Sequence, residues 1–363
     1  MAPKHKGNSA PVSDRPIVGV TMGDAAGIGP EIVIKALASP AVSRACRPLL
    51  IGDIRVMHDA LRFAPRPLEL HSVSRPQDAA WRPGVIDILD LNNIAPREYD
   101  IGAVSAACGR AFVETIRVSA SLANQGLIDA VASGPTNKES MHAAGFVQYS
   151  GQTDIYAEMC GSQHYFTVLV GGASRVYLVT SHVSLRKAID SVTRARVENV
   201  IRIADQSLRE LWKLPQPKIG VAGLNPHAGD GGLFGDEEIR EIIPAVEHMR
   251  REGIDVTGPE PADSLYFAAD QGQYDGIIGM YHDQGVIPLK RYGYVTVIAG
   301  TSILRTTAGH GTAYDIAWKG VARADVMERA ILLAAELATL RREASPGESD
   351  TDRRSGNPRR QPA

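Results

Sequence analysis

Three histidines lie in predicted turns, and each follows a short apolar run. The histidines are His182, His227 and His282, and the runs before them are residues 175–179, 219–222 and 276–280. Apolar runs of this length are typical of buried strands. Three imidazoles at strand ends can converge on one divalent metal ion and leave a coordination position open for a substrate. The pattern therefore predicts a metal-assisted enzyme, and the alternative is three unrelated histidines in loops.

A turn near the end of the chain has the residues to hold a nucleotide. Within residues 310–317, backbone N–H groups around Gly311 and Thr312 could cradle a phosphate or an adenine edge. Asp315 could accept hydrogen bonds from both hydroxyls of an adenosine ribose, and its charge would repel a 2′-phosphate. The turn therefore predicts NAD rather than NADP as the cofactor. The alternative is a helix cap made by Thr312 or Asp315.

A second glycine-rich turn, residues 22–31, follows a predicted strand and opens a predicted helix. It has neither the GxGxxG spacing of a dinucleotide-binding loop nor the lysine of a P-loop. Pro30 suits the first helical position, so the segment could be an ordinary turn between a strand and a helix. Asp24, at the mouth of this turn, is the residue that could take part in chemistry.

Predicted strands and helices alternate along the chain around these motifs. Besides the runs before the histidines, strands are expected at residues 16–21, 49–52, 127–132, 167–170 and 295–298. Helices are expected at residues 30–37, 104–122, 191–212, 237–251 and 323–341. This alternation predicts an α/β fold with mostly parallel sheets covered by helices. Ligands of such folds bind beyond the carboxyl ends of the strands, where the three histidines fall.

The composition limits the classes of function. A chain of 363 residues with a net charge of −2 is long enough for two domains and carries no signal for binding a polyanion. Aromatic residues make up 6% of it, which argues against stacking on single-stranded nucleic acid. There is no apolar run of membrane-spanning length, no apolar signal segment and no CxxC pair. We therefore expect a cytoplasmic enzyme with neither a nucleic acid nor a membrane as partner.

The motifs together resemble those of the 4-hydroxythreonine-4-phosphate dehydrogenase (PdxA) family, from about residue 16 to about residue 340. They are TMGDAAGIGPEI (21–32), GLNPHAG (223–229), PADSL (261–265), MYHDQG (280–285) and HGTA (310–313). The first and last are also similar to motifs of the isopropylmalate and isocitrate dehydrogenases. The resemblance therefore implies a two-domain, isopropylmalate-dehydrogenase-like fold.

The resemblance implies roles for the metal and for catalytic residues. The family's three metal ligands match His182, His227 and His282, and the family usually shares them across a dimer interface. We therefore expect a homodimer with a shared active site that holds a divalent ion: Zn, Mg, Mn or Co. Asp263 and Asp283 match acidic residues near the metal. They are expected to be catalytic together with Lys290, because a carboxylate or a lysine could take the proton of a substrate hydroxyl.

The resemblance also implies the residues that hold the two small molecules. The expected substrate-binding residues are Gln152, Thr153, Lys290, Thr296 and Arg305. The expected cofactor-binding residues are Asn225, Gly311, Thr312 and Asp315. Lysine and arginine would clamp an anionic group of the substrate, and the arginine would do so through a bidentate fork.

The implied reaction is the oxidation of a secondary alcohol by NAD to a β-keto acid, which loses CO₂. In pyridoxine biosynthesis the substrate is 4-hydroxythreonine 4-phosphate, but this chain departs from that pattern. Gln152 and Asn137 stand where the biosynthetic enzymes have histidines, and Thr296 stands where they have an asparagine. The alternative substrates are a four-carbon sugar-acid phosphate or a cis-dihydrodiol of an aromatic carboxylate. Outside this class, the alternatives are a metal-dependent hydrolase or lyase without nucleotide, and a non-catalytic binding protein.

The domain organisation follows from the same comparison. We expect a first domain, on the cofactor side, from residues 16–130 and 295–342. A second domain, with the metal ligands and the dimer interface, is expected from residues 131–294. Residues 1–15 and 343–363 are polar and nearly free of large apolar side chains, so both ends are expected to be disordered tails.

Overall fold

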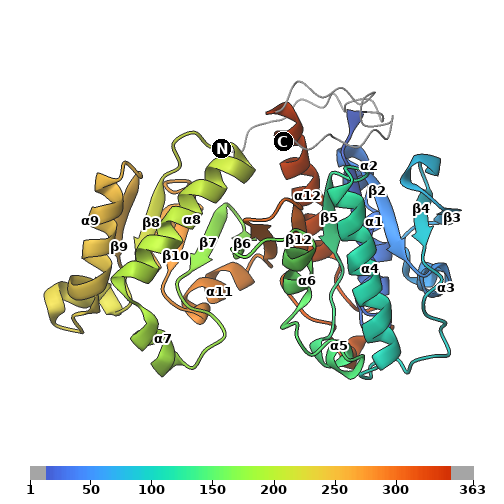
Figure 1. Cartoon of the computed structure of the whole chain (residues 1–363), viewed down its shortest axis with the longest axis horizontal. Helices are drawn as coiled ribbons and strands as arrows, with labels where there is room; N and C mark the ends of the chain where they lie inside the picture. Colours follow the sequence, from blue (N-terminus) through green and yellow to red (C-terminus); the bar gives the residue numbers. More distant parts are fainter. Residues whose placement is uncertain (1–13, 345–363) are drawn as a thin grey trace, which may run out of the picture. The chain divides into compact units, whose positions relative to one another are not determined.

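The computed structural model describes residues 14–344 and divides the chain into two compact units (Figure 1). In the described range, the first unit consists of residues 14–163 and 301–344, and the second of residues 164–300. The two predicted tails lie outside the described residues, apart from residues 14–15 and 343–344. No helix in residues 14–344 is both long enough and apolar enough to span a membrane.

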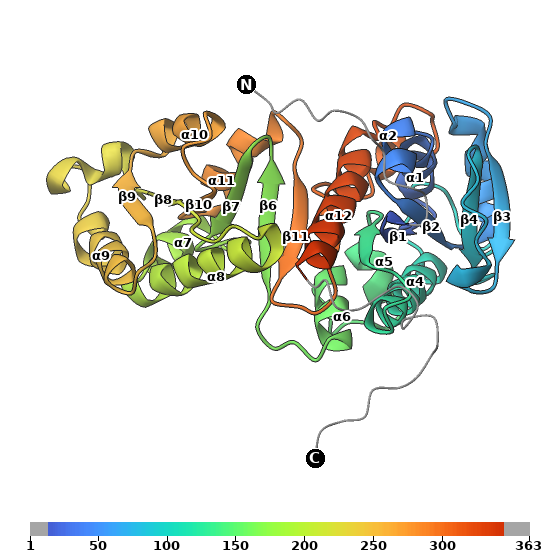
Figure 2. The same ribbon diagram turned by 90° about the horizontal axis from the view of Figure 1, so that it is seen from above.

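The first unit is a sheet of parallel strands in the order β3-β4-β2-β1-β5-β12. The strands are β1 (Ile17–Thr21), β2 (Arg47–Gly52), β3 (Glu69–Val73), β4 (Val85–Asp90), β5 (Ala130–Ser133) and β12 (Arg305–Ala308). The helices are α1 (Gly29–Leu37), α2 (Pro40–Ala45), α3 (Ile54–Ala60), α4 (Ala106–Asn124), α5 (Lys138–Ala143), α6 (Gln152–Met159) and α12 (Asp325–Glu343). Figure 2 shows α1, α2 and α12 over one face of the sheet and α4, α5 and α6 over the other.

Side-chain caps set where several of these helices begin. Ser39 accepts a hydrogen bond from the Ala41 N–H at the start of α2, and Asn137 accepts one from the Ser140 N–H at the start of α5. Such caps satisfy N–H groups that have no partner within the helix. Asn137, one of the departures noted in the sequence, therefore has a structural role here.

The second unit has a mixed sheet in the order β11-β6-β7-β10-β8-β9. The strands are β6 (Phe166–Gly171), β7 (Ser174–Leu178), β8 (Ile219–Ala222), β9 (Val256–Glu260), β10 (Gly276–Gly279) and β11 (Val295–Ala299). The pairs β11–β6 and β6–β7 are antiparallel, and the other pairs are parallel. The helices are α7 (Leu185–Ser191), α8 (Arg194–Trp212), α9 (Ile243–Arg251), α10 (Ala262–Asp270) and α11 (His282–Lys290). Because α8 and α9 cover one face and α10 and α11 the other (Figure 2), the predicted α/β fold with mostly parallel, helix-covered sheets is confirmed.

The unit boundaries differ from the predicted domain boundaries. Residues 131–163 belong to the first unit, because β5 pairs with β1 and β12, and α6 packs against α4. Residues 295–300 belong to the second unit, because β11 pairs with β6. The sequence showed the strand at residues 127–132 but not the neighbour with which it pairs.

Candidate active site

The three histidines follow the carboxyl ends of β7, β10 and β8, which are adjacent parallel strands in the second unit. His182 comes four residues after β7, His282 begins α11, and His227 lies in the turn after β8. The three predicted strands are therefore present, and their ends share one edge of the sheet. That edge is where α/β folds bind their ligands.

Two of the three imidazoles lie together. The ring centroids of His182 and His282 are 5.5 Å apart, and both residues line a cavity of about 570 Å³ together with Thr296. His282 donates a hydrogen bond from Nδ1 to the Asp283 carboxylate at 2.7 Å. This bond fixes the ring tautomer and leaves Nε2 available as a ligand, as in many metal sites. The donor set of this pair therefore fits a divalent transition metal.

His227 does not join that pair as a third ligand within one chain. In residues 14–344, no three histidine, cysteine or acidic side chains are grouped so that they could hold a metal ion. The ring of His227 packs edge-on against Phe234, with centroids 6.0 Å apart. The single-chain convergence of three imidazoles suggested by the sequence is therefore not present in the described residues.

The turn that carries His227 is strained. Residues 227–231 all have positive φ, between 45° and 80°, and His227, Ala228 and Asp230 among them are not glycine. A left-handed conformation costs about 1–2 kcal/mol for each such residue. Strain of this kind persists only where the surroundings hold it, and it clusters at functional sites.

The other predicted catalytic residues lie on α10 and α11. Asp263 and Asp283 are exposed and line a second cavity of about 590 Å³ between these helices. Asp283 therefore contacts His282 on one side and this second cavity on the other. Lys290 ends α11 and is exposed, with Nζ 5.7 Å from the centre of the Tyr294 ring. Asp263 and Lys290 do not line the cavity of the histidine pair.

A buried arginine marks the candidate substrate site of the first unit. Arg305 is 2% exposed, and it donates from Nε to Ser133 Oγ at 3.1 Å and from Nη1 to Thr153 Oγ1 at 3.3 Å. Its Nη2 is buried and has no hydrogen-bond partner in the described part of the chain. Burial lowers the pKa of Arg305 to about 10, so it is still a cation at neutral pH. A buried cation without a counter-charge is unfavourable, and an anionic ligand at Nη2 would relieve that cost.

Gln152 and Thr153 begin α6 beside this arginine. Gln152 donates from Nε2 to Thr307 Oγ1 at 3.5 Å, while its Oε1 is buried and has no partner among residues 14–344. The structure thus brings together three of the predicted substrate-binding residues, Gln152, Thr153 and Arg305. Thr296 and Lys290 belong to the other unit.

Sequence reasoning missed other members of this buried cluster around Arg305. Tyr156 lies under the guanidinium of Arg305, with its ring centre 5.3 Å away, and its hydroxyl is hydrogen-bonded to Ser119 and Ser133. One available signal was the position of Tyr156, one helical turn after Thr153. Ser133 offered another, because it stands at the carboxyl end of β5.

The two glycine-rich turns of the first unit meet. The Ile28 N–H donates to the Thr312 carbonyl at 2.9 Å, and the Tyr314 hydroxyl donates to the Asp24 carboxylate at 2.8 Å. Burial raises the pKa of Asp24, whose carboxylate also accepts a hydrogen bond from the Ala26 N–H. The first turn, which could have been an ordinary connection, therefore braces the predicted cofactor turn.

Within the cofactor turn, Gly311 and Asp315 are exposed and Thr312 is buried. The short helical turn Tyr314–Ile316 has no side-chain cap, so the alternative role of Thr312 or Asp315 as a helix cap is not realised. Asp315 is therefore placed so that its carboxylate can meet a ligand from solvent.

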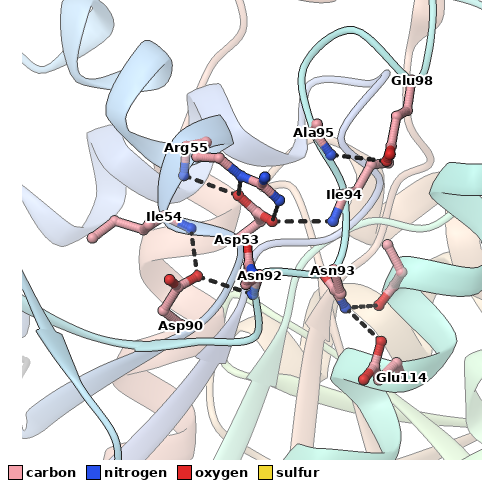
Figure 3. A network of polar contacts seen from close by, with 11 residues as sticks. Asp53, Ile54, Arg55, Asp90, Asn92, Asn93, Ile94, Ala95, Glu98 and Glu114 are labelled. Carbon is pink, nitrogen blue, oxygen red and sulfur yellow. Dashed lines mark hydrogen bonds and ion pairs between the residues drawn. The ribbon is translucent and has the colours of Figure 1, made fainter.

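Another acidic residue at a strand end of this unit, Asp53, is already occupied by protein donors (Figure 3). It caps α3 and accepts hydrogen bonds from the N–H groups of Arg55 and Ile94 and from the Arg55 guanidinium. Burial would raise the pKa of Asp53, but these hydrogen bonds lower it overall. Asp53 thus ties the segment after β4 to the start of α3.

Asn225, predicted to bind the cofactor, is also occupied. Its side-chain amide donates to Glu237 at 2.7 Å and to Glu238 at 2.9 Å. The structure therefore gives its side chain a role in shaping the turn before His227, and its cofactor role stays a prediction.

Comparison with known proteins finds one matching family and several similar enzymes. The family described as "Pyridoxal phosphate biosynthetic protein PdxA" matches residues 44–334. The D-threonate 4-phosphate dehydrogenase of Pectobacterium atrosepticum is 44% identical over 326 residues, which cover 89% of this chain and 99% of that protein.

Two solved structures are also similar. The 4-hydroxythreonine-4-phosphate dehydrogenase of Klebsiella pneumoniae is 41% identical, with a TM-score of 0.82, and the match covers 92% of this chain and all of that one. A terephthalate 1,2-cis-dihydrodiol dehydrogenase of Burkholderia xenovorans is 30% identical, with a TM-score of 0.58, and the match covers 88% of this chain and 98% of that one.

Proposed function

The chain belongs to the PdxA family, and from this premise we propose that it is an NAD-dependent dehydrogenase of a four-carbon phosphorylated hydroxy acid, D-threonate 4-phosphate. The family is one of dehydrogenases that act on a CH–OH group. The observation that supports an anionic substrate is the buried Arg305, whose Nη2 has no hydrogen-bond partner in the described residues. The choice of acid rests on the 44% identity to the enzyme of that name and on Gln152 in place of the family's histidine.

The chain's own residues supply most of what the reaction needs. Arg305 would bind the phosphate or carboxylate through charge-assisted hydrogen bonds, with Thr153 holding its guanidinium in place. Oxidation would occur at the hydroxyl-bearing carbon β to the carboxylate: NAD would accept its hydride, a base would take the hydroxyl proton, and the resulting β-keto acid would then lose CO₂. The base that takes the hydroxyl proton stays a prediction among Asp263, Asp283 and Lys290.

His182 and His282 would hold the divalent ion, which when bound supplies a Lewis acid that polarises the substrate oxygen. We propose that the protein is a homodimer in which the three histidines are shared between subunits. The pairing of only two of them within one chain supports that arrangement.

The substrate assignment has a direct test. With NAD and a divalent metal present, D-threonate 4-phosphate should give a kcat/KM at least about tenfold higher than 4-hydroxythreonine 4-phosphate, which carries an ammonium in place of one hydroxyl. The rate is measured from NADH absorbance and compared with CO₂ release, and unphosphorylated D-threonate serves as the control. If kcat/KM is instead at least about tenfold higher for 4-hydroxythreonine 4-phosphate, that compound is the substrate. Turnover without NAD would favour a hydrolase or lyase.

Replacing Asp315 with alanine should narrow the preference for NAD over NADP by about tenfold to a hundredfold. The reason is that hydrogen bonds to a charged group are worth about 1.5–3 kcal/mol, and the mutation also removes the repulsion of a 2′-phosphate. The measurement is kcat/KM for each cofactor, with the exposed Asp78→Ala as the control. If the unmodified enzyme prefers NADP, Asp315 does not have this role.

A further inference from the structure

Glu238 is a buried acidic residue that none of the roles described above uses. It is 1% exposed and begins a π-helical turn, Glu238–Ile242. Its Oε1 accepts hydrogen bonds from the N–H groups of Leu224 and Asn225, both at 2.7 Å, and its Oε2 accepts one from the Asn225 amide at 2.9 Å. Within residues 14–344 it forms no ion pair with a lysine, arginine or histidine. Protein N–H donors therefore stabilise this carboxylate.

The donors belong to the segment that leads directly into the left-handed turn of His227. Leu224 and Asn225 precede Pro226, and residues 227–231 then have positive φ. Glu238 thus fixes, through hydrogen bonds, the two residues that come just before the strained turn. Its carboxylate also faces Gly229, in the middle of the turn, where a built Cβ would lie 2.7 Å from Oε2.

Glycines on the turn allow this close approach. A Cβ at Gly229 would lie 2.7 Å from Glu238 Oε2, and one at Gly223 would lie 3.2 Å from Oε1 and 2.7 Å from the Ala228 Cα. Real Cβ atoms essentially never approach within 3.0 Å, so a side chain at either position would push the backbone or the carboxylate away. The turn and the carboxylate are fitted to each other.

We propose that Glu238 is a positioning residue that holds the His227 turn in its left-handed shape, so that the imidazole is presented ready to bind the divalent metal. This inference rests on the proposed function, because it takes His227 as a metal ligand. Glu238 does not contact the substrate or the metal. It acts through the backbone of residues 224–229, and through that backbone it lowers the cost of ordering His227 when metal binds.

The test is Co²⁺ titration of the full-length protein, with binding measured by calorimetry and no substrate present. Glu238→Gln replaces one acceptor oxygen with an NH₂ group that faces the Asn225 amide, and it should weaken Co²⁺ binding about 10- to 100-fold. Glu237→Gln is the matched control, because Glu237 also accepts from the Asn225 amide but is only partly buried and does not bond the backbone of the turn. It should change the affinity less than about threefold.

A rescue experiment separates positioning from charge. Ala228→Gly in the Glu238→Gln background should recover most of the lost affinity, because glycine adopts the left-handed conformation without strain. Equal affinities for Glu238→Gln and the unmodified protein, equal losses for Glu237→Gln and Glu238→Gln, or no rescue by glycine would each overturn the proposal. If Glu238→Gln melts too low for titration, Glu238→Asp, which keeps the charge but shortens the reach, gives the same comparison.

His227→Ala separates the metal role of His227 from the positioning role of Glu238. If it binds Co²⁺ as well as the unmodified protein does, the metal role of His227 is wrong and the inference falls with it. If it loses the metal while Glu238→Gln retains it, only the role of Glu238 is wrong.

Discussion

Replacing Arg305 with methionine should reduce kcat/KM for the phosphorylated acid by roughly 10- to 150-fold, mainly through a higher KM. The side chain is a fully buried cation with one nitrogen, Nη2, that has no partner in the described residues. Charge-assisted hydrogen bonds to a substrate anion there are worth about 1.5–3 kcal/mol. The measurement is steady-state kinetics with both the phosphorylated and the unphosphorylated acid.

Stability gives an independent check on this role. Methionine is apolar and of similar length, so Arg305→Met should leave the free energy of unfolding unchanged or raise it, because an unpaired buried charge is removed. Inorganic phosphate should raise the melting temperature of the unmodified protein but not that of the variant. Arg341→Met is the control, because Arg341 is an arginine that is partly buried but donates to the Ser302 carbonyl instead. An unchanged KM in Arg305→Met would show that the anion binds elsewhere.

Removing the metal should have the largest effect. Treatment with a chelator, or His282→Ala, should lower kcat by about three orders of magnitude or more. A bound Lewis acid contributes several kcal/mol to stabilising charge in the transition state, and each 1.36 kcal/mol is about tenfold in rate. The measurement is NADH formation after dialysis against chelator, followed by addition of Zn²⁺, Mn²⁺, Mg²⁺ or Co²⁺, with metal content determined in parallel.

A histidine outside the site serves as the control for that experiment. His248 lies on α9, where it contacts Glu198. His248→Ala should keep both the metal content and the rate. A His282→Ala protein with full metal content and a normal rate would contradict the assignment of the histidine pair.

Much of the framework was predictable from the sequence. The strands β7, β8 and β10 are short apolar runs with turn residues after them, so their ends could be placed before the structure was known. β12 was missed because its sequence, Arg-Thr-Thr-Ala, has no apolar run. All four of its residues are buried, including Arg305 and the two threonines, so a polar sequence here forms a core strand. β3 and β4 were also not predicted, and β3 is an edge strand with several partly exposed side chains.

The geometry of the His227 turn could not be predicted in the same way. Positive φ is expected at glycine, but His227, Ala228 and Asp230 adopt it although each has a Cβ. What holds them there is Glu238, a residue that lies beyond the turn in the chain. Local propensity does not report such a contact, and a single sequence gives no sign that these positions are coupled.

The first unit cannot be completed until the last part of the chain has been synthesised. Its sheet takes β1 to β5 from the first part of the chain and β12 from residues made after the whole second unit. The second unit is one continuous segment, so it can fold while the first is still missing a strand and the helix α12 that packs on α1 and α2. The cofactor turn arrives with this last piece, and Tyr314 must then find Asp24, 290 residues earlier. Long-range closure of this kind is slow, so a ribosome-bound chain lacking its last segment would present an unfinished sheet edge to chaperones and would still lack the predicted cofactor turn.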